Sequence, residues 1–147
     1  MSDHIFKSHN KTVLLYHLVF PAKYRRKVFT DMVDKGLKEI CLGISERYEI
    51  HFVEIGVEDD HVHLLVQSVP SLTVTRIVTI IKSITAREIF KLYLEVKKEL
   101  WGGSLWTSGY YANTVGQFAS EEVIRKYVAN QGSKYNRLHS APLLFDF

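Results

Sequence analysis

The sequence predicts an α+β fold, in which a ferredoxin-like β-α-β-β-α-β antiparallel sheet carries helices on one face and one further C-terminal helix follows. The chain has 147 residues, of which 46% are hydrophobic, and roughly 100–200 residues form one domain. Segments rich in β-branched and aromatic residues alternate with segments of helical periodicity. We therefore expect a single domain over residues 1–147, with a core at about 10–137 and an irregular tail at 138–147.

The predicted strands are apolar runs bounded by proline or turn residues. They are expected at residues 12–20, 50–57, 61–68 and about 110–114. The first run is β-branched, aromatic and apolar throughout, as in a central strand buried on both faces, and Pro21 ends it. The second and third runs form a hairpin around an acidic turn at 58–60. A turn at 101–106 leads into the fourth, aromatic run.

The predicted helices are expected at residues 31–48, 73–93 and 121–131. In the second of them, isoleucines recur every three or four residues, from Ile77 through Ile80 and Ile81 to Ile84. This spacing is typical of a helix that packs one face on the core. Gly132 ends the last helix, and an irregular tail is expected from Ser133 onward.

Composition excludes several classes of protein. Cys41 is the only cysteine, so neither an intrachain disulfide nor a cysteine-built zinc site can form. No apolar run reaches the roughly 20 residues that cross a bilayer, and residues 1–11 hold no signal-peptide hydrophobic stretch. We expect a cytoplasmic protein without a membrane partner.

The charge is uneven along the chain, although the net value is only +3. Residues 1–29 sum to +5, residues 49–72 to −5 and residues 73–137 to +5. Two basic segments around an acidic one suit a chain that meets a polyanion with two of its surfaces. An ordinary solvated charged face has the same composition.

The sharpest local feature is His61-Val62-His63 on the third predicted strand. Residues two apart on a strand point to the same face, so both imidazoles project together with Gln67, while Val62 faces the helices. Two neutral imidazoles can bind one divalent metal but need a third ligand from elsewhere. A bare pair of this kind also occurs as half-exposed strand histidines.

The last predicted helix carries Tyr127 and Gln131, which lie four residues apart and therefore on one helical face. A glutamine carbonyl oxygen can ligate Mg²⁺ or Mn²⁺, and a tyrosine beside such a metal can act as a nucleophile. Taken alone, this pair is also typical of a helix that packs through its tyrosine and ends at its glutamine.

Four separated segments together resemble the HUH single-tyrosine transposases, specifically the small enzymes of the insertion-sequence 200/605 class. The resemblance covers roughly residues 10–137. It is carried by Tyr16-His-Leu-Val-Phe-Pro-Ala-Lys-Tyr-Arg-Arg-Lys-Val-Phe29, His61-Val-His63, Leu105-Trp-Thr-Ser-Gly-Tyr-Tyr111 and Tyr127-Val-Ala-Asn-Gln131.

The resemblance implies a metal-dependent enzyme that cuts and rejoins single-stranded DNA at element ends that bear subterminal hairpins. His61 and His63 match the family's metal ligands, Gln131 the third ligand and Tyr127 the nucleophile that forms a 5′-phosphotyrosine. Because the covalent link conserves the phosphodiester's energy, no nucleotide cofactor is expected, and the metal is Mg²⁺ or Mn²⁺. The resemblance also implies a homodimer, in which one subunit's tyrosine helix often serves the other's histidines.

Given that resemblance, the basic groups become candidate DNA contacts. The candidates are Lys23, Tyr24, Arg25, Arg26, Lys27, Lys82, Arg87, Arg125 and Lys126. Among them, Tyr24 is available to stack on an unpaired base. Asp59 and Asp60 precede His61 and are candidates to orient the imidazoles as hydrogen-bond acceptors, although acidic residues are also common in turns.

Three other functions fit the same sequence. A domesticated relative would process hairpin repeats without moving an element. A non-catalytic module would bind single strands by stacking bases on aromatic residues of the exposed sheet face. A simple metal hydrolase would release products without a covalent protein–DNA bond.

Overall fold

The structure is a computed structural model that describes residues 5–7, 10–12, 14–115 and 135–137. The predicted final helix at 121–131 lies outside the described residues. With it, the candidate site residues Arg125, Lys126, Tyr127 and Gln131 lie outside them as well.

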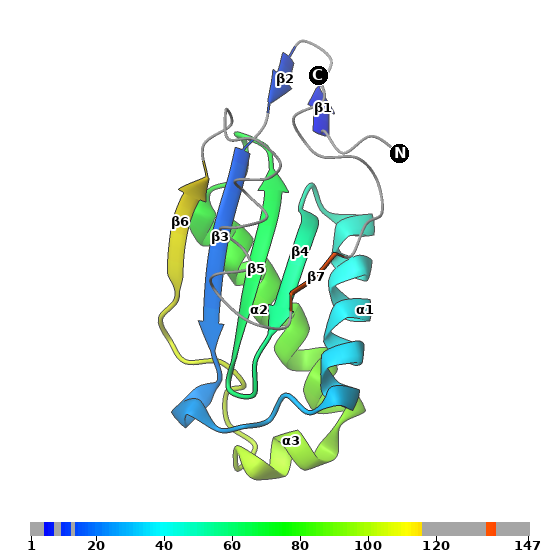
Figure 1. Cartoon of the computed structure of the whole chain (residues 1–147), viewed down its shortest axis with the longest axis vertical. Helices are drawn as coiled ribbons and strands as arrows, with labels where there is room; N and C mark the ends of the chain where they lie inside the picture. The colour runs from blue at the N-terminus through cyan, green and yellow to red at the C-terminus, as the bar shows by residue number, and fades with distance from the viewer. Residues whose placement is uncertain (1–4, 8–9, 13, 116–134, 138–147) are drawn as a thin grey trace.

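Five strands form one antiparallel sheet (Figure 1). They are β3 (Leu14–Pro21), β4 (His51–Val57), β5 (His61–Ser68), β6 (Tyr111–Val115) and β7 (Tyr135–Arg137). Their order across the sheet is β6-β3-β5-β4-β7. The first four strands have the antiparallel arrangement of the predicted ferredoxin-like sheet, which is confirmed.

The structure corrects the two ends of the described chain. Residues 135–137 form β7 and pair with β4, whereas the tail from Ser133 onward was expected to be irregular. Three polar and aromatic residues are too few to show strand periodicity, so only the pairing reveals this strand. At the other end, β1 (Ile5–Lys7) and β2 (Asn10–Thr12) form a separate two-stranded sheet. Because β2 includes Thr12, the predicted strand at 12–20 begins instead at Leu14.

The two long helices pack on one face of the sheet, and Figure 1 shows α2 behind the strands and α1 beside β4. They are α1 (Asp31–Arg47) and α2 (Val74–Leu92). A threonine hydroxyl caps each of them, because Thr30 accepts from the Val33 N–H and Thr73 from the Arg76 N–H. Two shorter elements were not predicted, namely η1 (Lys23–Arg25) and α3 (Leu94–Glu99). With three and six residues, they are too short to show a helical stripe.

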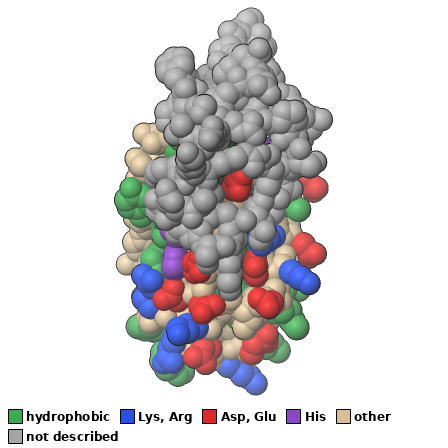
Figure 2. Space-filling view, viewed as in Figure 1, with side chains coloured by type: hydrophobic (Ala, Val, Ile, Leu, Met, Phe, Trp, Pro, Cys, Tyr) green, Lys and Arg blue, Asp and Glu red, His purple; other side chains and the backbone are tan. Residues whose placement is uncertain are grey.

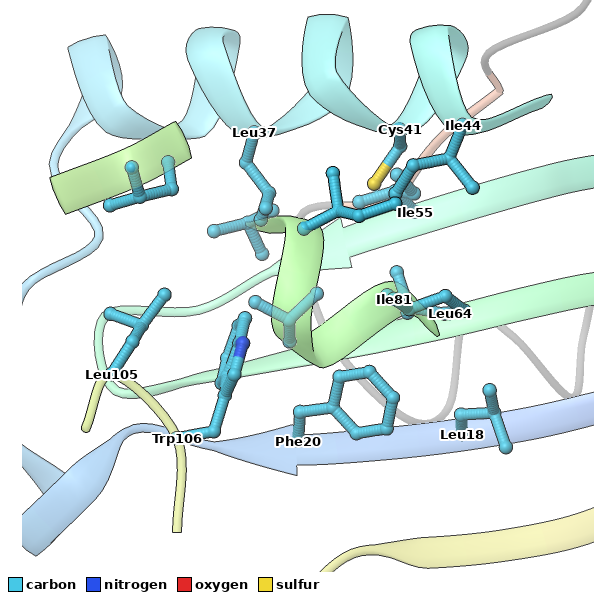
Figure 3. Packing of buried hydrophobic residues seen from close by; sticks show 14 of the residues in the cluster. Leu18, Phe20, Leu37, Cys41, Ile44, Ile55, Leu64, Ile81, Leu105 and Trp106 are labelled. Carbon is cyan, nitrogen blue, oxygen red and sulfur yellow. The ribbon is translucent and has the colours of Figure 1, made fainter. Parts of the chain in front are cut away.

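The core fills the space between the sheet and these helices. Figure 3 shows Leu37, Cys41 and Ile44 of α1 pointing toward the sheet residues Ile55 and Leu64. The isoleucine stripe predicted on α2 is confirmed as core. Among the described residues, no helix is long and apolar enough to cross a membrane. The sheet face under the helices therefore packs into an apolar core, whereas polar side chains such as His17, His63 and Gln67 lie on the other face.

Candidate active site: a histidine cluster on the second face of the sheet

Alternation along β5 assigns its side chains to two faces. Val62, Leu64 and Val66 belong to the core beneath the helices, so His61 and His63 project to the second face, as predicted. This face was expected to be free or covered by a partner, and in the structure His63 is only 5% exposed and Gln67 is fully buried.

A third histidine, His17 on β3, completes the cluster. The antiparallel register sets Val19 opposite His63 and His17 opposite Leu65, so His17 and His63 are diagonal neighbours on the second face. Their Nε2 and Nδ1 atoms, respectively, are 3.1 Å apart and hydrogen-bonded. The two rings are stacked, with centroids 5.3 Å apart and planes 7° from parallel.

Burial makes these two imidazoles neutral. Removal from water lowers the pKa of His17 from 6.5 to about 4. The pKa of His63 also falls to about 4, first because of burial and then because of the positive charges that His61 and His17 can carry. At neutral pH both rings are therefore uncharged, which is the form that ligates a metal.

His61 lies at the start of β5 and is held by the acidic turn before it. Its Nδ1 is 2.7 Å from Asp60 Oδ1, and the other oxygen of Asp60 accepts from Arg25 Nε at 3.2 Å. The hydrogen bond to His61 and then the Arg25 guanidinium lower the pKa of Asp60, against the opposing effect of burial. Asp59 contributes its backbone carbonyl, which accepts from the Phe29 N–H, and its role beside the imidazoles stays a prediction.

The donor set suits a hard or borderline divalent cation. The ring centroids of His61 and His63 are 4.8 Å apart, and in each ring Nδ1 is engaged by Asp60 or His17. A metal would then be bound through the two Nε2 atoms, an arrangement in which protein partners orient the ligands. Within the described residues, no three His, Cys, Asp or Glu side chains are grouped for metal binding.

Residues 23–27, which we call the basic segment, lie beside this cluster. Figure 1 places η1, the β4–β5 turn and α3 at one end of the molecule, where β5 begins. The Ala22 N–H donates to the Asp60 carbonyl at 2.8 Å, which fastens the segment to the acidic turn. On this face, basic and acidic side chains are interspersed over that end of the molecule (Figure 2). The candidate DNA contacts Lys23, Tyr24, Arg25, Arg26 and Lys27 follow Ala22 in this order.

Lys82 has an internal role that the sequence did not indicate. Its ammonium donates to the carbonyls of Thr107 and Gly109 at 2.8 and 2.9 Å, and burial lowers its pKa. These bonds hold the loop that leads into β6, so two of the three N–H groups are already used within the chain. Arg87 is more exposed than Lys82, and its Nε lies 3.7 Å from Glu88 Oε2.

His17 and Trp101 are the residues that sequence reasoning missed. His17 stood out only as a histidine inside an apolar run, and its partner is 46 residues away, so strand order was needed to find it. Trp101 was treated as a turn residue, yet it is exposed and contacts Tyr24 of the basic segment.

Comparisons with known proteins agree with this architecture. Residues 10–131 match the family model described as IS200-like transposase. The ISDra2 transposase TnpA of Deinococcus radiodurans is 36% identical over 121 residues, which cover 82% of this chain and 86% of that protein. The transposase for insertion sequence element IS200 of Salmonella typhimurium is 25% identical over 131 residues, which cover 89% of this chain and 85% of that protein.

Solved structures give the same result. A structure described as a transposase from Deinococcus radiodurans R1 aligns with a TM-score of 0.69 at 32% identity, covering 87% of this chain and 98% of that one. A REP-associated tyrosine transposase bound to a REP hairpin aligns with a TM-score of 0.51 at 13% identity, covering 100% and 95%. The second likeness concerns the fold alone. With the family model spanning most of its length and a 36% identical relative, this chain belongs to the IS200-like transposases, enzymes of DNA transposition.

Proposed function

We propose that the protein cleaves and rejoins single-stranded DNA at hairpin-bearing element ends, with a divalent metal and a phosphotyrosine intermediate. The observation that carries this proposal is the pair of adjacent imidazoles, His61 and His63, each with Nδ1 held by a protein partner. Such a pair supplies two oriented Nε2 ligands. Gln131, which the family resemblance matches to the third ligand, would complete the set.

Tyr127 is the proposed nucleophile. Its phenolic oxygen forms a bond to the phosphorus of the scissile phosphodiester while the bond from phosphorus to O3′ breaks. The phenolic proton passes to a solvent base, and the leaving oxygen takes up a proton to become a 3′-hydroxyl. A bound Mg²⁺ or Mn²⁺ would stabilise the negative charge that develops on the phosphate. A 3′-hydroxyl reverses the step and rejoins DNA, so no nucleotide cofactor is consumed.

Of the other functions considered for this sequence, the non-catalytic stacking module predicts a different second face. A stacking module would present aromatic rings on that face of the sheet. The central strands carry the buried His17 and His63 there, next to His61, and the Tyr111 ring of the edge strand β6 lies against His17. This arrangement favours a catalytic metal site over a base-stacking surface where the histidines lie.

The test is a covalent adduct on a denaturing gel. Incubation with Mg²⁺ or Mn²⁺ and a hairpin-bearing single strand should give a protein–DNA band that disappears in Tyr127→Phe and with EDTA. Tyr48→Phe, which alters an exposed tyrosine after α1, is the matched control and should keep the band. An undiminished adduct in Tyr127→Phe would refute the nucleophile assignment, and cleavage without any adduct would indicate a simple hydrolase.

We also propose a homodimer that shares its active sites. A His63→Ala subunit retains the tyrosine, and a Tyr127→Phe subunit retains the histidines. Mixing these two inactive variants should restore adduct formation if tyrosine and histidines from different subunits meet. A mixture that stays inactive would assign each site to a single subunit.

A further inference from the structure

Two large aromatic side chains are exposed side by side at the end of the molecule where β5 begins. Tyr24 is 65% exposed and Trp101 is 70% exposed. Their rings meet edge to face, with centroids 5.8 Å apart. Single exposed apolar residues are ordinary, but a paired aromatic surface rimmed by charges is typical of an interaction site.

The local backbone fixes both rings in this exposed arrangement. Tyr24 and Trp101 have φ values of 58° and 53°, in the left-handed region that residues with side chains rarely occupy. The Trp101 N–H donates to the Lys98 carbonyl at 3.0 Å, and the Gly102 N–H donates to the Lys97 carbonyl at 2.7 Å. Strained backbone that is held by hydrogen bonds in this way is common at binding sites.

One basic side chain lies against each ring. The Arg26 guanidinium lies 4.9 Å from the centre of the Trp101 ring and also pairs with Glu99 at 3.3 Å. Lys23 Nζ lies 5.4 Å from the Tyr24 ring. Trp101 also borders a surface hollow of about 400 Å³, whose other lining residues are Leu94, Lys97, Lys98 and Gly102. Aromatic faces next to cations suit a nucleotide, which offers a flat base and a negative phosphate.

A short chain of contacts connects these rings to the histidine cluster. Arg25, next to Tyr24, donates to one carboxylate oxygen of Asp60, and the other oxygen of Asp60 bonds His61. The Ala22 N–H fastens the same segment to the Asp60 carbonyl. The segment that carries Tyr24 is therefore anchored to Asp60, the residue that bonds His61.

We propose that Tyr24 and Trp101 form a stacking site for an unpaired nucleobase of the strand that enters the histidine cluster. Lys97 and Lys98 neutralise the adjoining phosphates. DNA as the ligand rests on the proposed function. Because every base has a stacking face, the site accepts any base and contributes affinity without reading sequence.

Fluorescence and binding measurements test this proposal. The only other tryptophan, Trp106, is buried and bonded to Thr85, so quenching by a short oligothymidylate reports on Trp101. Replacing Trp101 with Ala should weaken oligothymidylate binding, measured by fluorescence anisotropy, by roughly 5- to 150-fold, the equivalent of about 1–3 kcal/mol per stacked base. Trp101→Phe should retain most of the affinity. Tyr24→Ala should show a smaller loss in the same direction.

An abasic strand of equal length separates stacking from charge. Wild type and Trp101→Ala should bind it equally, whereas a Lys97→Ala/Lys98→Ala variant should lose affinity for both strands. Tyr48→Ala, at an exposed tyrosine after α1, is the control and should bind as wild type. Wild-type affinity of Trp101→Ala for oligothymidylate, or equal losses on both strands, would overturn the proposal. Adduct formation by Trp101→Ala at saturating DNA is measured separately. It tests the proposed function independently of the stacking site.

Discussion

Replacing His17 tests how the metal site is held. His63 can ligate through Nε2 only if its proton is on Nδ1, which then donates to Nε2 of His17, 3.1 Å away. His17 would thus act as the acceptor that selects this tautomer. His17→Ala removes the acceptor and the stacked ring. His17→Gln keeps a carbonyl oxygen as acceptor but loses the ring.

The expected magnitude follows from the burial of both groups. In His17→Ala, the Nδ1–H of His63 loses the acceptor it has in wild type, and leaving a buried donor unsatisfied costs about 1–3 kcal/mol. At about 1.4 kcal/mol for each factor of ten, this equals roughly a 5- to 150-fold loss of metal affinity. Removal of residues that orient metal ligands typically costs about 10- to 100-fold, in the same range.

Titration of Mn²⁺ into metal-free protein, followed by electron paramagnetic resonance of the free ion, measures the affinity without any DNA chemistry. We expect wild type to bind most tightly, His17→Gln less tightly and His17→Ala least. Nitrogen NMR of the imidazoles should show His63 protonated on Nδ1 in wild type. Unchanged Mn²⁺ affinity in His17→Ala, or a proton on Nε2 of His63 in wild type, would refute the reasoning.

Three further outcomes follow from the described contacts. The unfolding free energy of the protein in EDTA should decrease as the pH falls from about 6.5 toward about 4. The reason is that His17 and His63 take up protons in the unfolded chain but stay neutral when buried in the folded one. Urea titrations at several pH values that show no such loss would contradict the two pKa values. Trp106→Phe should lower the unfolding free energy by about 1–3 kcal/mol, since the indole N–H donates to the buried Thr85 hydroxyl at 3.0 Å, and an unchanged thermal midpoint would argue against that bond. Lys82→Met should accelerate hydrogen exchange in the loop before β6, whose two carbonyls its ammonium holds, while exchange in α1 stays unchanged; equal exchange in both proteins would deny Lys82 this role.

Local sequence signals were sufficient to predict an element where turn residues or proline mark both of its ends. β5 was predicted at its exact bounds, because an acidic turn precedes its alternating pattern and Pro70 follows it. The isoleucine stripe likewise identified the buried face of α2. The shortest elements were missed, since a three-residue strand such as β7 carries no periodicity and exists only through its pairing with β4.

The candidate site was only partly readable for a different reason. The sequence alone places His61 and His63 on one sheet face, because they lie two residues apart on a single strand. The contact between His17 and His63 depends on which strands are neighbours and in what register. The exposure of Trp101 depends on a left-handed backbone turn that its neighbours' hydrogen bonds fix. Tertiary relations of this kind leave no local signal.

The position of the histidines on β3 and β5 ties the precision of the site to the core. These strands are flanked by other strands on both sides, and their opposite faces contribute Leu18, Phe20 and Leu64 to the packing beneath the helices. A one-residue slip of β3 along β5 would turn His17 into the core and move Leu18 to the second face. The same packing that excludes such a slip therefore fixes the distance between His17 and His63. The rigid sheet holds the imidazoles, whereas the exposed rings of Tyr24 and Trp101 occupy the loops at its end, where ligands of varied sequence can be accommodated.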